Sequence, residues 1–415
     1  MSVRETRLSH LGSVTLGKMV QSTGADGFVD LPYVRAAHIQ PMGRWHEATP
    51  KTMPFSPVEA RELDIRRDDV LIVEGGAGFG RAYRVAADMP GWGFQNSIVR
   101  IRPKTDRADG RFVSYALQSA LNTGRIALEA SVATIPHFTA EKASAFRVPA
   151  PDLHVQSVVA DLLDRETAKI DALIAKQDAL GARLRERHRA AIAQAVEAVL
   201  DPSSGARFKH FVTEMRQGWS PQCESVPADG VTEWGVLKTG CVNGGVFRPE
   251  ENKLLPADTE PRPEAVVRRG EIVMSRASTR DLVGSAAVVE ADYPRLMLSD
   301  KTYAITVDRR IADPWFVSSL LGTPRIRQAI ELEATGASHS MQNVSKEDLL
   351  NLPMPLPPVG SQVEVVRALQ VDAPKVDAMV GKAQQLSAKL KERRAALITA
   401  AVTGKLDVTT YGKAG

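Results

Sequence analysis

The chain has 415 residues, of which 43% are hydrophobic and 25% are charged. This length is sufficient for two or three domains with their own cores, and the ordinary composition excludes a disordered chain. The formal net charge is +4 and the pI about 9.0, which is compatible with a polyanionic partner but does not require one.

The cysteines and the apolar runs indicate the cellular compartment. Cys223 and Cys241 match no metal-binding spacing and no disulfide framework, which favours a reducing environment. No run approaches the roughly 18 apolar residues of a membrane span, and the first residues lead into no apolar signal segment. We therefore expect a cytoplasmic protein with no membrane contact.

Residues 1–150 are expected to form a mixed α/β domain. Short apolar runs at Val70–Val73 and Ile98–Ile101, bounded by turn residues, predict strands. Residues 111–129 predict a helix late in the segment.

A long amphipathic helix is predicted over residues 152–201, which contain no proline. Apolar residues recur there at steps of three and four, among them Val159, Ile170, Leu173 and Leu180. About 45 residues at about 1.5 Å each give a rod of roughly 65–70 Å. A narrow apolar seam on such a rod needs a partner.

The second half follows the same plan. Runs at Ile272–Met274 and Tyr303–Val307 predict strands, and residues 315–333 predict a helix. A second long helix is predicted from about Gln362 to Val402. Pro374 removes one backbone donor from it and is expected to kink or restart the helix.

An internal repeat relates the two halves. Residues 135–200 align with residues 341–406 without a gap, at an offset of 206 that pairs the sequence KIDA with KVDA and Gln156 with Gln362. Upstream the offset falls to about 202, so insertions and deletions separate the two front segments. The rear segments therefore do one task twice, and the fronts do two different tasks.

The repeat divides the chain into four segments. Residues 1–150 and 207–356 are two α/β (α+β) domains in tandem. Residues 151–206 and 357–415 are two spacer segments, each with a long helix. Because the second domain must return the chain, we expect the two helices to pack as an antiparallel coiled coil.

Turns of the second domain contain candidates for DNA contact. Arg276 and Arg280 flank Ser278 and Thr279 in one turn, a set suited to phosphates and base edges. Two further polar turns offer amide, hydroxyl and indole groups, and amides are the groups that read adenine. Their candidate residues are His339, Ser340, Gln342 and Asn343, and Trp219, Ser220 and Gln222.

The first domain and the helices offer further candidates. Arg44, Trp45 and His46, with Arg81, are the expected counterparts in the first domain. Near the helix ends, basic clusters are candidates for contact with a protein partner, although a solvated face explains them equally well. Their members are Arg185, Arg187, Lys391, Arg393 and Arg394.

Two motifs carry a family resemblance. The run Gly336–Val344, with its continuation through Leu352–Pro358, resembles the end of a target-recognition domain in specificity subunits of type I restriction-modification systems. The tail, from Leu390–Arg394 to Gly404–Val408, resembles that family's last helix and closing motif. The order of domains and helices also matches, although residues 132–138 depart from the family pattern.

The resemblance implies separate roles for the two domains and the two helices. Each domain would read one half of a split site in double-stranded DNA. The helices would act as a spacer and as the docking surface for two adenine methyltransferase subunits, which a restriction subunit can join. The resemblance implies no catalytic residue, metal or cofactor in this chain, because AdoMet binds the methyltransferase subunit. Two readers on a rigid rod would read two sites at a set separation.

Two other functions compete with this reading. Glu74–Gly80 follows a strand like a nucleotide-binding loop, and Asp313–Phe316 is similar to a methyltransferase motif, so the chain could itself be an AdoMet-dependent methyltransferase. However, alternation from Arg81 onward predicts a hairpin, and Asp313 is expected to cap the helix beginning near Trp315. The other alternative is a scaffold whose two domains bind no DNA.

Overall fold

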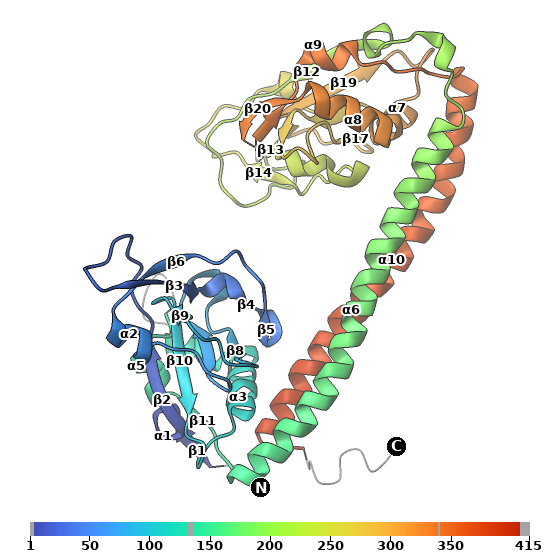
Figure 1. Ribbon diagram of the computed structural model, residues 1–415. Helices are drawn as coiled ribbons and strands as arrows, with labels where there is room; N and C mark the ends of the chain where they lie inside the picture. Colours follow the sequence, from blue (N-terminus) through green and yellow to red (C-terminus); the bar gives the residue numbers. More distant parts are fainter. Residues whose placement is uncertain (1–3, 131–136, 339–340, 407–415) are drawn as a thin grey trace. The chain divides into compact units, whose positions relative to one another are not determined.

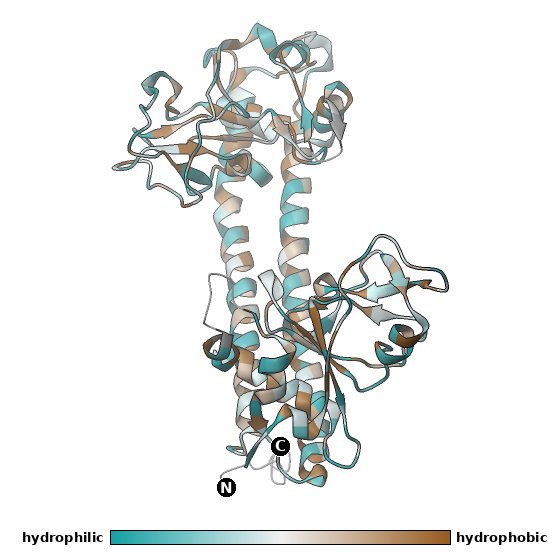
Figure 2. Ribbon diagram, turned by 90° about the vertical axis from the view of Figure 1, so that its left-hand side faces the viewer, coloured by the Kyte–Doolittle hydropathy of each residue, from teal (hydrophilic) through white to brown (hydrophobic). Residues whose placement is uncertain are grey.

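The computed structural model describes residues 4–130, 137–338 and 341–406 (Figure 1). The chain folds into two units, the first formed by residues 1–179 and 383–415 and the second by residues 180–382. Each unit therefore contains one globular domain and one portion of each long helix. In Figure 2 the strands of both domains are mainly apolar, whereas the long helices mix apolar and polar residues.

A four-stranded antiparallel sheet lies at the centre of the first domain, in the order β2 (Gly12–Leu16), β10 (Ile98–Pro103), β7 (Val70–Val73) and β8 (Ala82–Arg84). Val70 and Ile72 share a core with α3 (Gly110–Asn122), while Leu71 and Val73 share another with a second sheet. Both faces of β7 are thus covered, which explains its unbroken apolar run. The second sheet and the short elements are β6 (Thr52–Phe55), β3 (Val29–Val34), β9 (Gly93–Phe94), β1 (Glu5–Arg7), β11 (Arg147–Pro149), β4 (Ile39–Gln40), β5 (Arg44–Trp45), α1 (Leu8–Leu11), α2 (Pro57–Glu62) and α5 (Ala140–Ala145).

The second domain repeats this arrangement in the order β12 (Val212–Gln217), β19 (Thr302–Val307), β15 (Ile272–Ser275) and β17 (Ala286–Val288). Ile272 and Met274 pack with α7 (Pro314–Leu321), and Val273 packs on the other side with Leu237 and Leu296. The predicted strands of both domains are confirmed. The remaining elements are β13 (Gly235–Leu237), β14 (Asn252–Leu254), β18 (Leu296–Met297), β16 (Ala277–Ser278), β20 (Thr335–Ser338), β21 (Met341–Asn343) and α9 (Lys346–Asn351).

The helix predicted late in each domain is in fact two helices. In the first domain α3 is followed by α4 (Arg125–Ala130) after Gly124, whose φ of 75° no right-handed helix accepts. In the second domain α8 (Pro324–Glu333) begins at a proline directly after α7, which suits the first turn of a new helix. The single-helix prediction was wrong because each break falls inside a continuous apolar period.

Both long helices are present, as α6 (Leu153–Glu197) and α10 (Val359–Val402). Pro374 lies inside α10, and the helix runs through it, so of the two expected outcomes, a kink or a restart, the restart does not occur. The proline leaves the carbonyl of Gln370 without its helical donor. Gln370 and Pro374 are both exposed, so that water can hydrate this carbonyl.

Within the first unit the two helices pack antiparallel, as predicted. Asp178 accepts a hydrogen bond from Ser387 at 2.8 Å, while Asp171, further back on α6, pairs with Arg394, further on along α10, at 3.1 Å. The seam differs from the predicted one. Leu173 and Leu180 are 46% and 47% exposed, and their neighbours Ile174 and Gly181 are buried instead.

A buried glutamine fixes the start of each long helix to its own domain. Gln156 accepts from the Asp109 N–H at 3.1 Å and donates to the carbonyls of Arg107 and Pro151 at 3.1 and 2.8 Å. Gln362, its partner in the repeat, bonds in the same way with Asp313 N–H, Ile311 O and Pro357 O at 2.9, 2.9 and 2.8 Å. Both amides are fully satisfied, as burial requires.

The far end of each long helix completes a core. Ile398 and Val402 of α10 belong to the core of the first unit. Val196 of α6, which the repeat pairs with Val402, belongs to the core of the second unit together with Val366. The helices are therefore integral parts of both units.

Candidate nucleic-acid interface

One hairpin in each domain presents a loop that differs between the two halves. In the first domain residues 74–81 connect β7 and β8, which pair as Ile72 with Ala82. In the second domain residues 276–285 connect β15 and β17, which pair as Met274 with Ala286. The same sheet framework thus holds two loops of different length and composition, the arrangement expected of two readers with different targets.

A returning segment closes over the start of each loop. In the second domain β21 pairs with β16, placing Asn343 opposite Ala277 and Gln342 opposite Ser278. In the first domain His137 bridges to Gly75. The 206-residue offset relates His137 to Asn343, so the same junction is built twice. A Cβ at Gly75 would lie 2.8 Å from His137 Nδ1, so a larger residue there would displace the His137 ring.

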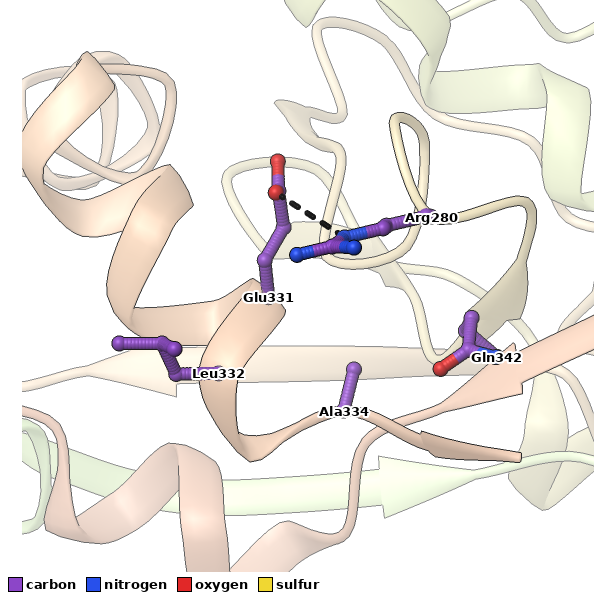
Figure 3. Close-up of a pocket in the computed structure, with 5 residues that line it drawn as sticks. All are labelled: Arg280, Glu331, Leu332, Ala334 and Gln342. Carbon is purple, nitrogen blue, oxygen red and sulfur yellow. Dashed lines mark ion pairs between the residues drawn. The ribbon is translucent and has the colours of Figure 1, made fainter. Parts of the chain in front are cut away.

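In the second domain this junction gathers most of the predicted DNA-contacting residues. Arg280 lines a pocket with Gln342, and Glu331, Leu332 and Ala334 complete its lining (Figure 3). The Arg280 Nε lies 3.6 Å from Glu331 Oε2. Ser278, Thr279 and Asn343 lie on the same paired strands or the turn beyond them. His339 and Ser340 lie outside the described residues.

Arg276 is held more deeply than Arg280. Its guanidinium lies 5.6 Å from the ring centre of Tyr303, within range of a cation–π interaction. The Tyr303 hydroxyl donates to the Val344 carbonyl at 3.5 Å, and Lys346 lies 5.7 Å from the same ring. Burial raises the pKa of the Tyr303 hydroxyl, so this tyrosine is a neutral donor at physiological pH. Arg276 thus supports the junction through Tyr303 and through its carbonyl, which accepts from the Val344 N–H.

The loop of Trp219, Ser220 and Gln222 is tied to the same region through the backbone. Ser220 bonds the Asp300 carboxylate, and the next residue, Lys301, accepts a backbone hydrogen bond from Arg276 at 2.9 Å. Trp219 stacks under Arg262, whose guanidinium lies 4.2 Å from the ring centre. The Trp219 indole N–H is buried without a partner among the described residues, whereas Gln222 is exposed.

The first-domain candidates lie on a different part of their domain. Arg44 and Trp45 form β5, and the Trp45 ring stacks on His38 with centroids 4.9 Å apart. Arg44 reaches Asp171 of α6 at 3.4 Å, and His46 is exposed. Arg81, in contrast, lies at the end of the hairpin loop. By position, Arg81 and His137 are therefore the first-domain counterparts of the residues at the second-domain junction. His137 was not among the residues predicted from the sequence.

The helix candidates divide into two groups. Arg185, Arg187, Lys391 and Arg393 are exposed. Arg394 is 6% exposed and donates to Asp171, Gln118 and the carbonyl of Met42. This arginine joins α10 to α6 and to the first domain, so we do not retain it as a candidate for partner contact.

In the described part of the chain, the two motifs that suggested a methyltransferase have structural roles. Gly76–Gly78 form a single tight turn inside the β7–β8 hairpin, as predicted, and the chain continues into strand β8 and not into a helix. Asp313 caps α7 by accepting from the Trp315 and Phe316 N–H groups, also as predicted. Within residues 4–130, 137–338 and 341–406, no cluster of three or more potential metal ligands occurs, and no helix is long and apolar enough to span a bilayer.

Comparison with known proteins gives consistent relatives. No protein-family model matches the chain. A stretch of 164 residues is 32% identical to the Type I restriction enzyme EcoEI specificity subunit of Escherichia coli, covering 40% of this chain and 28% of that protein. Over 308 residues the chain is 20% identical to the EcoKI specificity subunit of Escherichia coli (strain K12), covering 71% of this chain and 65% of that protein. The chain thus spans less than two thirds of either relative.

A solved structure shares the fold along the whole chain. A chain from a structure that describes complex assembly and conformational transition of the type I R-M system covers 98% of both chains, with a TM-score of 0.60 and 18% identity. At this identity the likeness establishes the fold alone. Together with the sequence relatives and the repeated order of domain and helix, it shows that this chain is similar to type I restriction-modification specificity subunits.

Proposed function

We propose that this chain is the DNA-reading subunit of a type I restriction-modification complex. Residues 1–150 and 207–356 would be two target-recognition domains, each reading one half of a split site, and residues 151–206 and 357–415 would be the spacer segments between them. The observation that carries the proposal is the duplicated junction. One framework supports His137 over Gly75 in one domain and Asn343 over Ala277 in the other. Equal frameworks with unequal loops suit two different half-sites.

The long helices would also dock two copies of one partner, the adenine methyltransferase subunit. Leu173 and Leu180 of α6 are 46% and 47% exposed. Met379 and Leu386, their partners in the repeat, are 47% and 45% exposed on α10. Residues seven apart lie on one face of a helix. Each helix therefore offers the same exposed apolar pair, which supports two equal docking sites.

A basic row accompanies each apolar pair. Lys169, Lys176 and Arg183 are exposed along α6 at seven-residue spacing. The repeat places Lys375, Lys382 and Lys389 along α10, also exposed. Because each residue turns the helix by about 100°, these side chains lie about 40–80° around the helix axis from the apolar pair. We therefore expect the partner to present a helix with apolar residues flanked by acidic ones. The exposed basic residues Arg185, Arg187, Lys391 and Arg393 would lie near this partner helix.

Paired substitutions test this docking. Leu173→Asp with Leu180→Asp, or Met379→Asp with Leu386→Asp, should each leave one bound methyltransferase subunit in native mass spectrometry where the unaltered chain binds two. Ala175→Asp with Ala182→Asp is the matched control, because both alanines are exposed and lie about half a turn away on α6. Two bound subunits in every variant would contradict these sites.

Catalysis would belong to the partner, which binds AdoMet, and this chain would supply no catalytic group. Incubating the purified chain with AdoMet and duplex DNA tests this division. We expect methylation only after the methyltransferase subunit is added. Substantial methylation by the chain alone would contradict the proposal and favour a methyltransferase in this chain. A restriction subunit would join the same complex where the system encodes one.

A further inference from the structure

Glu331 places a negative charge at the edge of the second-domain junction. Its side chain is 29% exposed and lies 3.6 Å from Arg280, whose side chain is 58% exposed (Figure 3). A carboxylate at a DNA-facing edge repels the phosphates and so lowers affinity for any sequence. Glu331 also faces the half-buried Arg327 one turn earlier on the same helix, and base discrimination would give it a second use at this edge.

The Arg280–Glu331 contact is not what holds the loop in place. Arg327, one turn earlier on α8, donates to the carbonyls of Val283 and Asp281 and so fastens the same loop from its other side. The Arg280 contact, in contrast, is a single long ion pair between an exposed arginine and a half-buried glutamate, which contributes little in water. No hydrogen bond of the Arg280 terminal nitrogens is found within the described residues, so these nitrogens can bind a ligand.

From this geometry we infer that Arg280 and Glu331 together read one G·C base pair, an inference that rests on the proposed function. The guanidinium of Arg280 would donate to O6 and N7 of guanine, and the Glu331 carboxylate would accept from the N4 amino group of cytosine. A·T pairs are rejected twice, because thymine O4 would face the carboxylate and the adenine amino group would face the guanidinium.

The pocket supports this pairing with a partly apolar lining. It has a volume of about 300 Å³, and Leu332 and Ala334 lie on the side of α8 and the chain that follows it. Gln342 lines it from β21 (Figure 3). Leu332 is 75% exposed, so this edge of the pocket is open to a ligand.

The test uses the complex of this chain with its methyltransferase subunits and a duplex DNA library randomised in both half-sites. Arg280→Ala and Glu331→Gln should both relax the same G·C position of one half-site, with preference falling roughly 5- to 150-fold. Glu331→Gln should admit thymine there, because an amide can also donate. Arg310→Ala is the control, since Arg310 is an exposed arginine that pairs with Asp308 in the same domain. It should leave both half-sites unchanged.

Other outcomes would overturn the inference. A uniform loss of methylation in Arg280→Ala would make Arg280 a phosphate contact, and relaxation at an A·T position would assign the wrong pair. No changed position in Glu331→Gln would also contradict it. If a thermal melt shows that Arg280→Ala is unfolded, Arg280→Lys replaces it. This variant keeps the positive charge but loses the two parallel N–H donors of the guanidinium, and it must relax the preference at the same base pair. Absence of any sequence preference in the unaltered complex would instead refute the proposed function.

Discussion

Replacing Gln156 with leucine should destabilise the first unit by about 2–4 kcal/mol, through three hydrogen bonds at about 1 kcal/mol each and one buried amide N–H left unpaired. The side chain is 1% exposed and bonds Asp109, Arg107 and Pro151. Calorimetry should show the transition of the first unit lowered by roughly 5–15 °C. Gln362→Leu should lower that of the second unit to a similar extent, because its three bonds match.

An exposed glutamine on the same helix provides the control. Gln194 is exposed on α6, so Gln194→Leu should change the free energy of unfolding by no more than about 0.5 kcal/mol. Amide hydrogen exchange should then show faster opening at the start of α6 in Gln156→Leu and at the start of α10 in Gln362→Leu. The anchoring role would be refuted if Gln156→Leu were as stable as Gln194→Leu.

Other perturbations probe the helices, a loop and the cysteines. Arg394→Ala should cost about 2–4 kcal/mol in chemical denaturation, because it removes the buried bonds to Asp171 and Gln118 and leaves Asp171 only the longer contact with the exposed Arg44; a cost near zero would contradict the contact. Gly218→Ala should destabilise the second unit, because a Cβ would meet the Leu298 carbonyl, and an unchanged melting temperature would count against this. Burial raises the pKa of the Cys241 thiol to about 12, so iodoacetamide at pH 8 should spare it until the protein unfolds. Seven residues inserted in both α6 and α10 should widen the gap between half-sites by about three base pairs, at about 1.5 Å per residue and 3.4 Å per base pair, while altered bases within a half-site would contradict a spacer role.

The sequence was sufficient for the architecture because the repeat and the apolar runs are long. Strands such as Val70–Val73 are buried on both faces, which leaves an unbroken apolar signature. The start of each helix was also predictable, since Gln156 and Gln362 occupy equal places in the repeat and make equal bonds. Long-period signals of this kind survive the divergence of loops.

Details decided by a few neighbouring residues could not be predicted in this way. The choice between Leu173 and Ile174 for the seam is a rotation of one residue, which apolar spacing alone does not fix. Arg394 looked like its exposed basic neighbours, and its burial depends on Asp171, more than two hundred residues away. His137 could have been found, because the 206-residue offset already paired it with Asn343. Glu331 could not, since its role depends on a loop that folds against α8.

The most direct test of the account is a genome-wide map of N6-methyladenine in cells with and without this gene. We expect a split motif, two specific half-sites separated by a fixed gap, that is methylated only when the gene is present. Exchanging residues 207–356 for the corresponding domain of a relative should then change one half-site and keep the other. A methylation pattern that does not depend on the gene, or a motif without two parts, would contradict the account.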